Sequence, residues 1–286
     1  MKYSDIIWNE FIYGSHWGSL NAIAISISII LILKINGKWE FLLISYLLTQ
    51  CIYSYNHCKE IEIDSISNAS RVEHLKRYRN ILPLLTGLYG VLFFSILIYF
   101  GNKESIFFGG FLLILGLLFT IIGKKITKKI VGFKSFYTAL AWALLIVFTT
   151  VYHSYSMDSK VIILLIFVFL RLVINTSFSD IKDLEGDRKN NIFTLPMIFK
   201  NVKNWLTFLH FLNIFSFIPL LFGIITGIIP NYTIFLFFTF FYSFYYIHKA
   251  KNEDINKNSL YNVIVDGEYY YWPALLFIGI IITRLL

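Results

Sequence analysis

The segment VIILLIFVFLRLVINTSF, residues 161–178, is almost wholly apolar, and it is followed one residue later by DIKDLEGDRKNNIFTLP, residues 180–196. An apolar run of this length predicts a helix that crosses a bilayer, because about 20 apolar residues span the hydrocarbon layer. Three aspartates then recur at i, i+3 and i+7, which places them on one helical face: Asp180, Asp183 and Asp187. Like charges on one face repel each other, so this pattern predicts a cation that neutralises them.

The whole chain has the composition of an integral membrane protein. Of its 286 residues, 57% are hydrophobic and 15% are charged, whereas a soluble domain has roughly 25% charged residues. The mean hydropathy is +0.67. The apolar stretches are apolar on all sides, whereas the strands of a transmembrane barrel would alternate. We therefore predict an all-α fold, organised as a single polytopic membrane domain over residues 1–286.

Nine stretches are read as transmembrane helices. They are residues 17–34, 41–57, 80–100, 105–123, 135–153, 160–179, 204–225, 231–248 and 268–286. Lys and Arg gather in the N-terminal segment and in the loops after the second, fourth, sixth and eighth stretches, which predicts that these segments are cytoplasmic. Membrane orientation, and not nucleic-acid binding, thus explains the net charge of +8. We expect the protein in a bacterial or archaeal cell membrane, with its active-site loops in the cytoplasm.

A second acidic set follows the second predicted span. Asn56, Glu60 and Asp64 recur at i, i+4 and i+8, on the same predicted side of the membrane as the three aspartates. Carboxylate and amide oxygens suit Mg²⁺, which keeps waters and shares phosphate ligands. Two such helix ends across a cavity would hold Mg²⁺ against a diphosphate and help it leave. Either set alone would also fit an exposed acidic helix end, but two sets on one side favour a metal site.

Basic residues near these sets are candidates for binding diphosphate oxygens. The loop GKKITKKIVGFK, residues 123–134, contains five lysines. Topology and lipid headgroup attraction explain most of them, and at least one could reach a diphosphate. Arg171 lies inside a predicted span, where a structural pair and a substrate role both stay open. Further candidates are Arg71, Arg77, Arg79 and Arg188.

Aromatic residues make up 19% of the chain. Core packing and interfacial belts account for most of these rings. A minority could line a cavity that holds a polyprenyl chain and screens an allylic cation through cation–π contacts.

The two acidic motifs resemble the signatures of the UbiA superfamily of intramembrane prenyltransferases. Its second signature, Asp-x-x-Asp-x-x-x-Asp followed often by Gly-Asp-Arg and Thr-Leu-Pro, is matched closely by DIKDLEGDRKNNIFTLP. Its first, Asn-Asp-x-x-Asp-x-x-x-Asp, reads Asn56-His57-x-x-Glu60-x-x-x-Asp64 here. His57 and Glu60 thus replace two aspartates, and SNASRVEHLKRYR replaces the usual Arg-Pro-rich segment. The chain is therefore not matched to a quinone, haem, chlorophyll or ether-lipid branch.

The resemblance implies two four-helix halves plus a ninth helix around a central cavity open sideways to lipid. It also implies Mg²⁺ as cofactor, and a prenyl diphosphate donor, a hydrophobic acceptor and membrane lipid as partners. The predicted metal-binding residues are Asn56, Glu60, Asp64, Asp180, Asp183 and Asp187. Asp64 and Asp183 are the predicted catalytic residues, and which carboxylate takes the acceptor's proton stays open. The predicted diphosphate-binding residues are Lys129 or else Lys128, with Arg71 and Arg188.

The predicted function is Mg²⁺-dependent transfer of a polyprenyl group, an alkyl group other than methyl, from a prenyl diphosphate to a lipophilic acceptor. The acceptor would be an aromatic quinone precursor or a lipid. One alternative is a membrane terpene cyclase that uses the same site without an acceptor. Another is a transporter or lipid-binding protein with a decayed site. Transporters place polar residues near the bilayer midplane, whereas the acids here cluster at the membrane edge.

Overall fold

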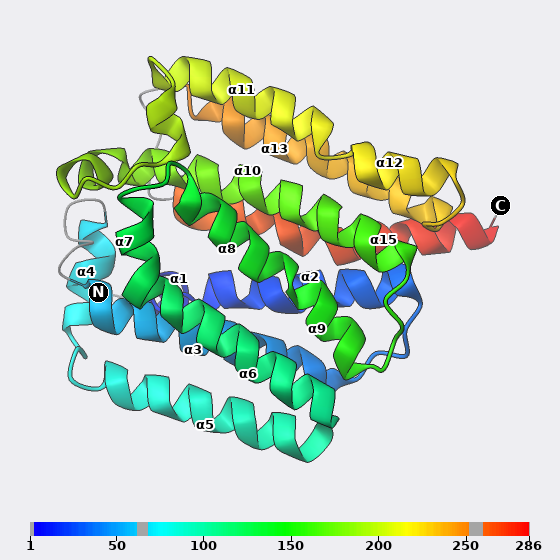
Figure 1. Cartoon of the computed structure of the whole chain (residues 1–286), viewed down its shortest axis with the longest axis horizontal. Coiled ribbons are helices and arrows are strands. Elements are labelled where there is room, and N and C mark those ends of the chain that lie inside the picture. The colour runs from blue at the N-terminus through cyan, green and yellow to red at the C-terminus, as the bar shows by residue number, and fades with distance from the viewer. Residues whose placement is uncertain (1–2, 62–67, 252–259, 286) are drawn as a thin grey trace.

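The computed structural model of the protein describes residues 3–61, 68–251 and 260–285. Over these residues the chain is helical and has no strand, and the long helices lie side by side along one direction (Figure 1). The predicted all-α class is therefore confirmed.

The first half of the chain begins with a short N-terminal helix and ends in a π-helix and a single helical turn. Asn102 caps one of the long helices, since its side chain accepts a hydrogen bond of 2.7 Å from the backbone N–H of Ser105. The helices are α1 Tyr3–Tyr13, α2 His16–Leu33, α3 Trp39–Glu60, α4 Ala69–Lys76, α5 Leu82–Phe100, α6 Lys103–Leu118, η2 Phe119–Gly123 and α7 Lys124–Thr127.

The second half is built around α10, whose 31 residues have a length of about 46 Å at 1.5 Å per residue. This exceeds the roughly 30 Å hydrocarbon layer, so the C-terminal turns of α10 project beyond the apolar region. The helices are α8 Phe133–Ala143, α9 Leu145–Tyr152, α10 Ser159–Lys189, η3 Leu195–Ile198, α11 Val202–Phe215, α12 Ile218–Ile225, η4 Asn231–Phe237, α13 Phe238–Lys249, η5 Leu260–Ile264 and α15 Val265–Leu285.

Six helical stretches within the described residues are long and apolar enough to cross a membrane. They are His16–Leu33, Leu82–Phe100, Lys103–Gly123, Phe133–Tyr152, Ser159–Lys189 and Val202–Ile225. The other three predicted spans are also helical, as α3, η4 with α13, and α15, but they fall short of that criterion. Their polar and tyrosine-rich segments lower their hydropathy. A multi-pass membrane architecture is supported, and the count of nine spans stays a prediction.

The helices close into a ring because the first and last predicted spans pack together. α2 contacts both α3 and α15, α3 packs on α5, and α8 packs on α10. In Figure 1, α5 and the pair α11 and α13 lie at opposite edges, with α2, α8, α10 and α15 between them. Aromatic pairs fill the interior: the ring centroids of Phe41 and Phe148 are 5.2 Å apart, and those of Phe167 and Trp272 are 5.4 Å apart.

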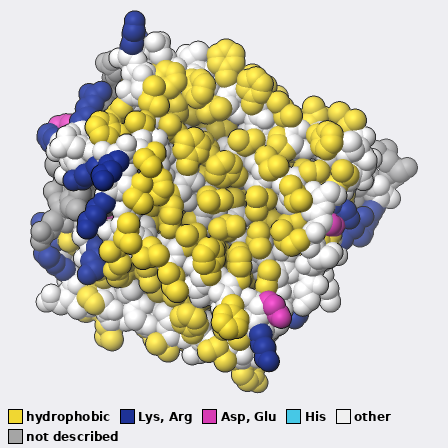
Figure 2. Space-filling view, in the orientation of Figure 1, with side chains coloured by type: hydrophobic (Ala, Val, Ile, Leu, Met, Phe, Trp, Pro, Cys, Tyr) yellow, Lys and Arg dark blue, Asp and Glu magenta, His cyan; other side chains and the backbone are white. Residues whose placement is uncertain are grey.

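The exterior is apolar in the middle and basic at one end. On α5 and α6, large side chains such as Leu84 and Phe107 are exposed, as lipid-facing residues of a membrane protein are expected to be. Figure 2 shows a broad field of hydrophobic side chains, with Lys and Arg gathered along the edge at which Figure 1 places α4 and α7. This charged edge, the basic end of the molecule, is the end at which α3 carries Asn56 and Glu60 and α10 carries its three aspartates.

Arg171 is fully buried and paired. Its guanidinium Nη2 lies 2.5 Å from Glu268 Oε1 on α15, and it also donates to Asn213, Ser216 and Ser243 on the facing helices. Ser243 and Tyr246 donate to the other oxygen of Glu268. The structural pair with a carboxylate, one of the two roles left open by the sequence, is thus the one that the structure supports.

Candidate active site

The three aspartates of α10 gather around one lysine. Lys134 Nζ lies 2.9 Å from Asp180 Oδ1, 3.5 Å from Asp183 Oδ2 and 3.7 Å from Asp187 Oδ2. Their helical spacing brings them to one face, and the packing of α8 on α10 places Lys134 opposite that face. Asp180 is the most deeply held, because it also accepts a hydrogen bond of 2.5 Å from Ser135 Oγ.

A glycine turn delivers Lys134 to this position. Gly132 has φ +74°, a left-handed conformation that favours glycine. Its N–H donates to the Phe193 carbonyl at 3.0 Å, and the Phe193 N–H donates to the Thr127 carbonyl at 3.2 Å. A Cβ at position 132 would lie only 2.5 Å from Leu195 Cδ2. The basic loop is therefore attached to the segment after α10, and α8 begins directly beside the aspartates.

The first acidic set is brought to the same cavity in part. Asn56 and Glu60 lie on successive turns of α3 and line a cavity of about 300 Å³ that Asp183 and Asp187 also line. Asn56 Oδ1 accepts a hydrogen bond from Thr120 on η2. Asp64, predicted as a metal ligand and catalytic residue, lies outside the described residues.

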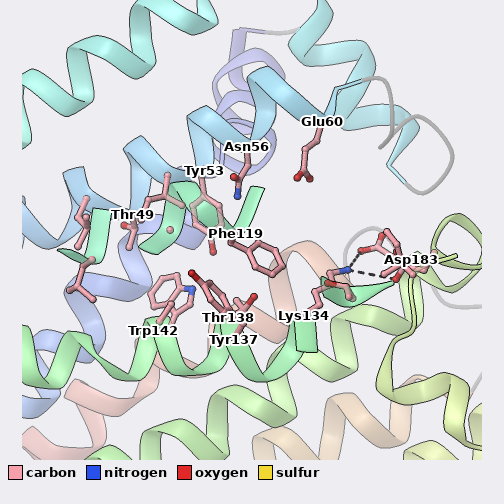
Figure 3. A pocket seen from close by; sticks show the side chains of 18 of the residues that line it. Thr49, Tyr53, Asn56, Glu60, Phe119, Lys134, Tyr137, Thr138, Trp142 and Asp183 are labelled. Atoms are coloured by element: carbon pink, nitrogen blue, oxygen red, sulfur yellow. Dashed lines mark ion pairs between the residues drawn. The ribbon is translucent and has the colours of Figure 1, made fainter. Parts of the chain in front are cut away.

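This cavity, the donor cavity, is polar at one end and apolar at the other. In Figure 3, Asn56 and Glu60 approach from α3, while Lys134 and Asp183 close the polar end. Tyr53, Phe119, Tyr137 and Trp142 surround the rest of the space. Further in, the lining is aliphatic: Leu48, Ile52, Leu112 and Leu145. Such a space fits a molecule with an anionic head and a hydrocarbon tail.

A second cavity of about 240 Å³ adjoins the donor cavity. It lies toward α2 and the start of α15, and it is lined by Asp180 and Lys182 of α10 and by Asp266 of α15. The two cavities share six wall residues: Tyr53, Arg71, Lys134, Thr138, Trp142 and Asp183.

The structure distinguishes among the predicted cations. Arg71 on α4 lines both cavities. Lys128, Lys129 and Arg188 have exposed side chains and line neither cavity. Lys134, one of the five lysines in the loop but not selected from the sequence, lines both. The sequence signal that could have singled it out is its place in the first turn of a helix, just after a glycine turn.

His57 faces away from both cavities. Its Nε2 lies 2.9 Å from Ser15 Oγ, in the junction between α1 and α2, and its side chain is buried. It replaces an aspartate of the first UbiA signature, but the structure places it on the side of α3 that faces the junction between α1 and α2. Asn56 and Glu60 occupy the face that meets the cavity.

The oxygen atoms at the polar end of the donor cavity are suitable ligands for Mg²⁺ bound together with a substrate. The oxygens come from carboxylates and an amide, and buried Asp187 Oδ2 has no hydrogen-bond partner among the described residues. No group of three His, Cys, Asp or Glu side chains in the described part of the chain encloses a metal position by itself. Mg²⁺ in proteins usually binds one or two carboxylates, and water and substrate phosphate oxygens complete its coordination shell.

The profile of the UbiA prenyltransferase family matches residues 22–264. The chain belongs to the UbiA prenyltransferase family. The resemblance indicated by the two motifs is thereby confirmed, over a region that contains both acidic sets and the lining of the donor cavity. No curated protein sequence matches the chain.

Solved structures share this UbiA fold at low sequence identity. An apo UbiA homologue from Aeropyrum pernix K1 has a TM-score of 0.71 and 12% identity, with 93% of this chain and 98% of that chain covered. A UbiA homologue from Archaeoglobus fulgidus bound to GPP and Mg²⁺ has a TM-score of 0.69 and 12% identity, covering 95% and 99%. A structure titled for digeranylgeranylglyceryl phosphate synthase in membranes has a TM-score of 0.60 and 16% identity, covering 97% and 98%.

Proposed function

We propose that the protein is a Mg²⁺-dependent prenyltransferase that moves a polyprenyl group from a prenyl diphosphate to a lipophilic acceptor within the membrane. The observation that carries the proposal is the donor cavity, in which acidic residues of α3 and α10 and the cations Arg71 and Lys134 form one end. The other end is aromatic and aliphatic. A diphosphate fits the first end and a prenyl chain the second.

At the polar end, the chain's own residues bind and orient the leaving group. Asn56, Glu60, Asp183 and Asp187 would hold Mg²⁺, with Asp64 as a further proposed ligand, and the ion would neutralise charge on the departing diphosphate. Lys134 and Arg71 are placed to donate hydrogen bonds to diphosphate oxygens. Asp180 is tied to Ser135 and Lys134, so its role is to hold the lysine in position.

Along the rest of the cavity, ring faces enclose the prenyl group. Tyr53, Phe119, Tyr137 and Trp142 exclude water from the carbon that loses the diphosphate, and their π faces stabilise positive charge that develops there. An acceptor nucleophile must approach that carbon from the side not occupied by the diphosphate.

Structures with the same fold support this assignment. Archaeoglobus fulgidus homologues have been solved with GPP and Mg²⁺ and with DMAPP and Mg²⁺. A further structure is titled for digeranylgeranylglyceryl phosphate synthase in membranes. Their shared fold is the reason to test prenyl diphosphates of several lengths.

The first test removes the metal-binding carboxylates. Purified protein in lipid nanodiscs should release diphosphate from geranyl, farnesyl or geranylgeranyl diphosphate only with Mg²⁺ and a lipophilic acceptor. Asp183→Asn with Asp187→Asn should lower that rate by at least about 100-fold, because oxyanion and metal charge stabilisation is usually the largest catalytic effect. Glu185→Gln is the matched control, since this exposed acid lies on α10 between the two aspartates.

The products separate the alternatives. Mass spectrometry should find a prenylated acceptor and no product from prenyl diphosphate alone. A terpene formed without acceptor would identify a cyclase instead. Unchanged Mg²⁺-dependent release in the double variant would show that the metal assignment is wrong.

A further inference from the structure

The second cavity has a chemistry that the donor does not require. It lies between α2, α8, α10 and the start of α15, and its lining is more polar than that of the donor cavity. Hydrogen bonds join α2 to η5 and α15 along one wall: Trp17 Nε1 donates to the Val263 carbonyl at 3.1 Å, and the Tyr270 hydroxyl donates to the Trp17 carbonyl. The rings of Trp17 and Tyr270 are 4.3 Å apart.

Two buried polar atoms in this cavity have no hydrogen-bond partner among the described residues. They are Asn21 Oδ1 on α2 and the Tyr269 hydroxyl on α15. Their residues are only 4% and 2% exposed. Buried polar groups are normally hydrogen-bonded, because desolvation without a partner is costly. An amide oxygen can only accept, so the missing partner of Asn21 must be a hydrogen-bond donor.

The charges around the cavity are balanced. Its lining contains the carboxylates Asp180, Asp183 and Asp266 and the cations Arg71, Lys134 and Lys182. Lys134 is engaged by the aspartates of α10. A ligand with a net negative head would face three carboxylates, and one with a positive head would face three cations. A neutral head group with a hydroxyl is compatible with this equal number of positive and negative side chains. Its hydroxyl can also donate the hydrogen bond that Asn21 Oδ1 lacks.

Asp266 belongs to α15 and so to the wall that α2 and α15 form, whereas Asp180 and Asp183 belong to α10. It lies at the basic end of the molecule, ahead of the predicted span 268–286. Burial raises its pKa to about 6, although Lys182 and a hydrogen bond from Asn175 lower it in part. Because its pKa is raised, the ionised carboxylate accepts a proton more readily than that of an exposed aspartate.

We propose that the second cavity binds the neutral, hydroxyl-bearing head group of the acceptor, held by Asn21 and Tyr269, with Asp266 as the proton acceptor. The inference rests on the proposed function. In the step, the acceptor oxygen forms a bond to the prenyl carbon that bears the diphosphate. The bond from that carbon to the diphosphate oxygen breaks, and its electron pair leaves with the diphosphate. The hydroxyl proton passes to the Asp266 carboxylate.

The binding test uses a defined probe because the natural acceptor is unidentified. The probe is a bromoalkyl glycerol, with its hydroxyl-methylated ether as the comparison. Binding is read from quenching of tryptophan fluorescence in nanodiscs, since Trp17 and Trp142 line the cavity. Mg²⁺-dependent binding of non-cleavable geranyl S-thiolodiphosphate is measured on the same samples.

The expected result is that the glycerol binds at least about tenfold more tightly than its ether, as loss of a hydrogen bond to a buried group predicts. Asn21→Leu and Tyr269→Phe should each weaken glycerol binding by a similar factor and leave thiolodiphosphate binding unchanged. Matched controls are Asn204→Leu and Tyr99→Phe, both at exposed positions. Tyr269→Phe removes a single oxygen that has no hydrogen-bond partner among the described residues, so we expect this variant to fold like the unaltered protein.

Asp266→Asn tests the proton transfer separately. It should keep the affinities for the glycerol and the thiolodiphosphate within about twofold and lower glycerol-dependent diphosphate release by at least about 100-fold. Unchanged glycerol-dependent release would overturn the role of Asp266. Equal binding of glycerol and ether, with thiolodiphosphate bound normally, would overturn the acceptor site alone. Absence of thiolodiphosphate binding in the unaltered protein would overturn the proposed function, and the acceptor role with it.

Discussion

At the scale of single residues, one lysine organises the site. Three carboxylates on one helical face repel each other, and Lys134 lies within 4 Å of all three. The same lysine lines both cavities. It therefore holds the acidic face together in the free protein and is placed to bind diphosphate oxygens when the donor enters.

Lys134→Met should lower the rate of diphosphate release by at least about 100-fold, because it removes a positive charge beside the leaving group. Lys134→Arg should retain part of the activity. Lys128→Met and Lys129→Met are the matched controls, since these neighbouring lysines are exposed and line neither cavity. Steady-state rates in nanodiscs measure the effect. A large loss in Lys129→Met with an active Lys134→Met would restore the diphosphate role that the sequence assigned to Lys129.

At the scale of elements, α10 serves both the active site and the core. Its C-terminal turns carry the aspartates, and Arg171 connects the middle of α10 to α11, α13 and α15 through Asn213, Ser243 and Glu268. A buried charge without its partner is much more costly than a buried pair. The position of α10 in the bundle therefore depends on this pair being complete.

Arg171→Met should reduce the free energy of unfolding by about 3–5 kcal/mol, because Glu268 would remain buried without a countercharge. The double variant Arg171→Met with Glu268→Leu should be less destabilised than the single variant. Thermal or denaturant unfolding in detergent measures both, with Arg284→Met at the exposed end of α15 as control. Equal stability of Arg171→Met and the unaltered protein would mean that the pair does not hold these helices.

A second element-scale feature couples the N-terminal helix to the site. Glu10 on α1 lies 2.7 Å from His74 Nε2 and accepts a hydrogen bond of 3.2 Å from the Tyr78 hydroxyl, and His16 Nε2 lies 3.6 Å from it. His74 belongs to α4, the helix that carries Arg71 into both cavities. α1 thus fixes the placement of a cation in the site.

This contact should make stability depend on pH in acid. Partial burial alone would raise the pKa of Glu10, but hydrogen bonds from His16, His74 and Tyr78 outweigh it and lower the pKa from 4.5 to about 2. The stabilisation is present above pH 4.5 and declines as the pH falls toward about 2. The gap in melting temperature between the unaltered protein and Glu10→Gln should therefore narrow from about pH 6 to about pH 3. A constant gap would contradict this.

At the scale of the whole molecule, the surface has one basic end and an apolar middle (Figure 2). Asn56, Glu60, the three aspartates of α10, Arg71 and Lys134 all lie toward the basic end. Because Lys and Arg are retained on the cytoplasmic side, we propose that the site opens to the cytoplasm, where diphosphate is released. Residues 1–286 would then form a single membrane domain, as predicted from the sequence.

Cysteine labelling in cells tests this orientation. With Cys51 and Cys58 replaced by Ser, Lys103→Cys at the exposed start of α6 should react with a membrane-impermeant maleimide in intact cells. Lys128→Cys, at the basic end, should react only after permeabilisation. The reverse pattern would place the active site on the outer side.

The sequence by itself determined the helical membrane class, the family and the two acidic sets. These features are local, since hydropathy depends on neighbouring residues and helical spacing alone brings Asp180, Asp183 and Asp187 to one face. It did not determine which polar residues meet across the ring. Lys134 lines the two cavities, and Lys128 and Lys129 do not, because α8 packs on α10 and Gly132 turns the chain. His57 does not line the cavities because its side chain contacts Ser15, between α1 and α2. Asn21, Tyr269 and Asp266 come from opposite ends of the chain and share a cavity because α2 packs on α15. Contacts between residues far apart in sequence depend on how whole helices pack, and only the tertiary structure decides that.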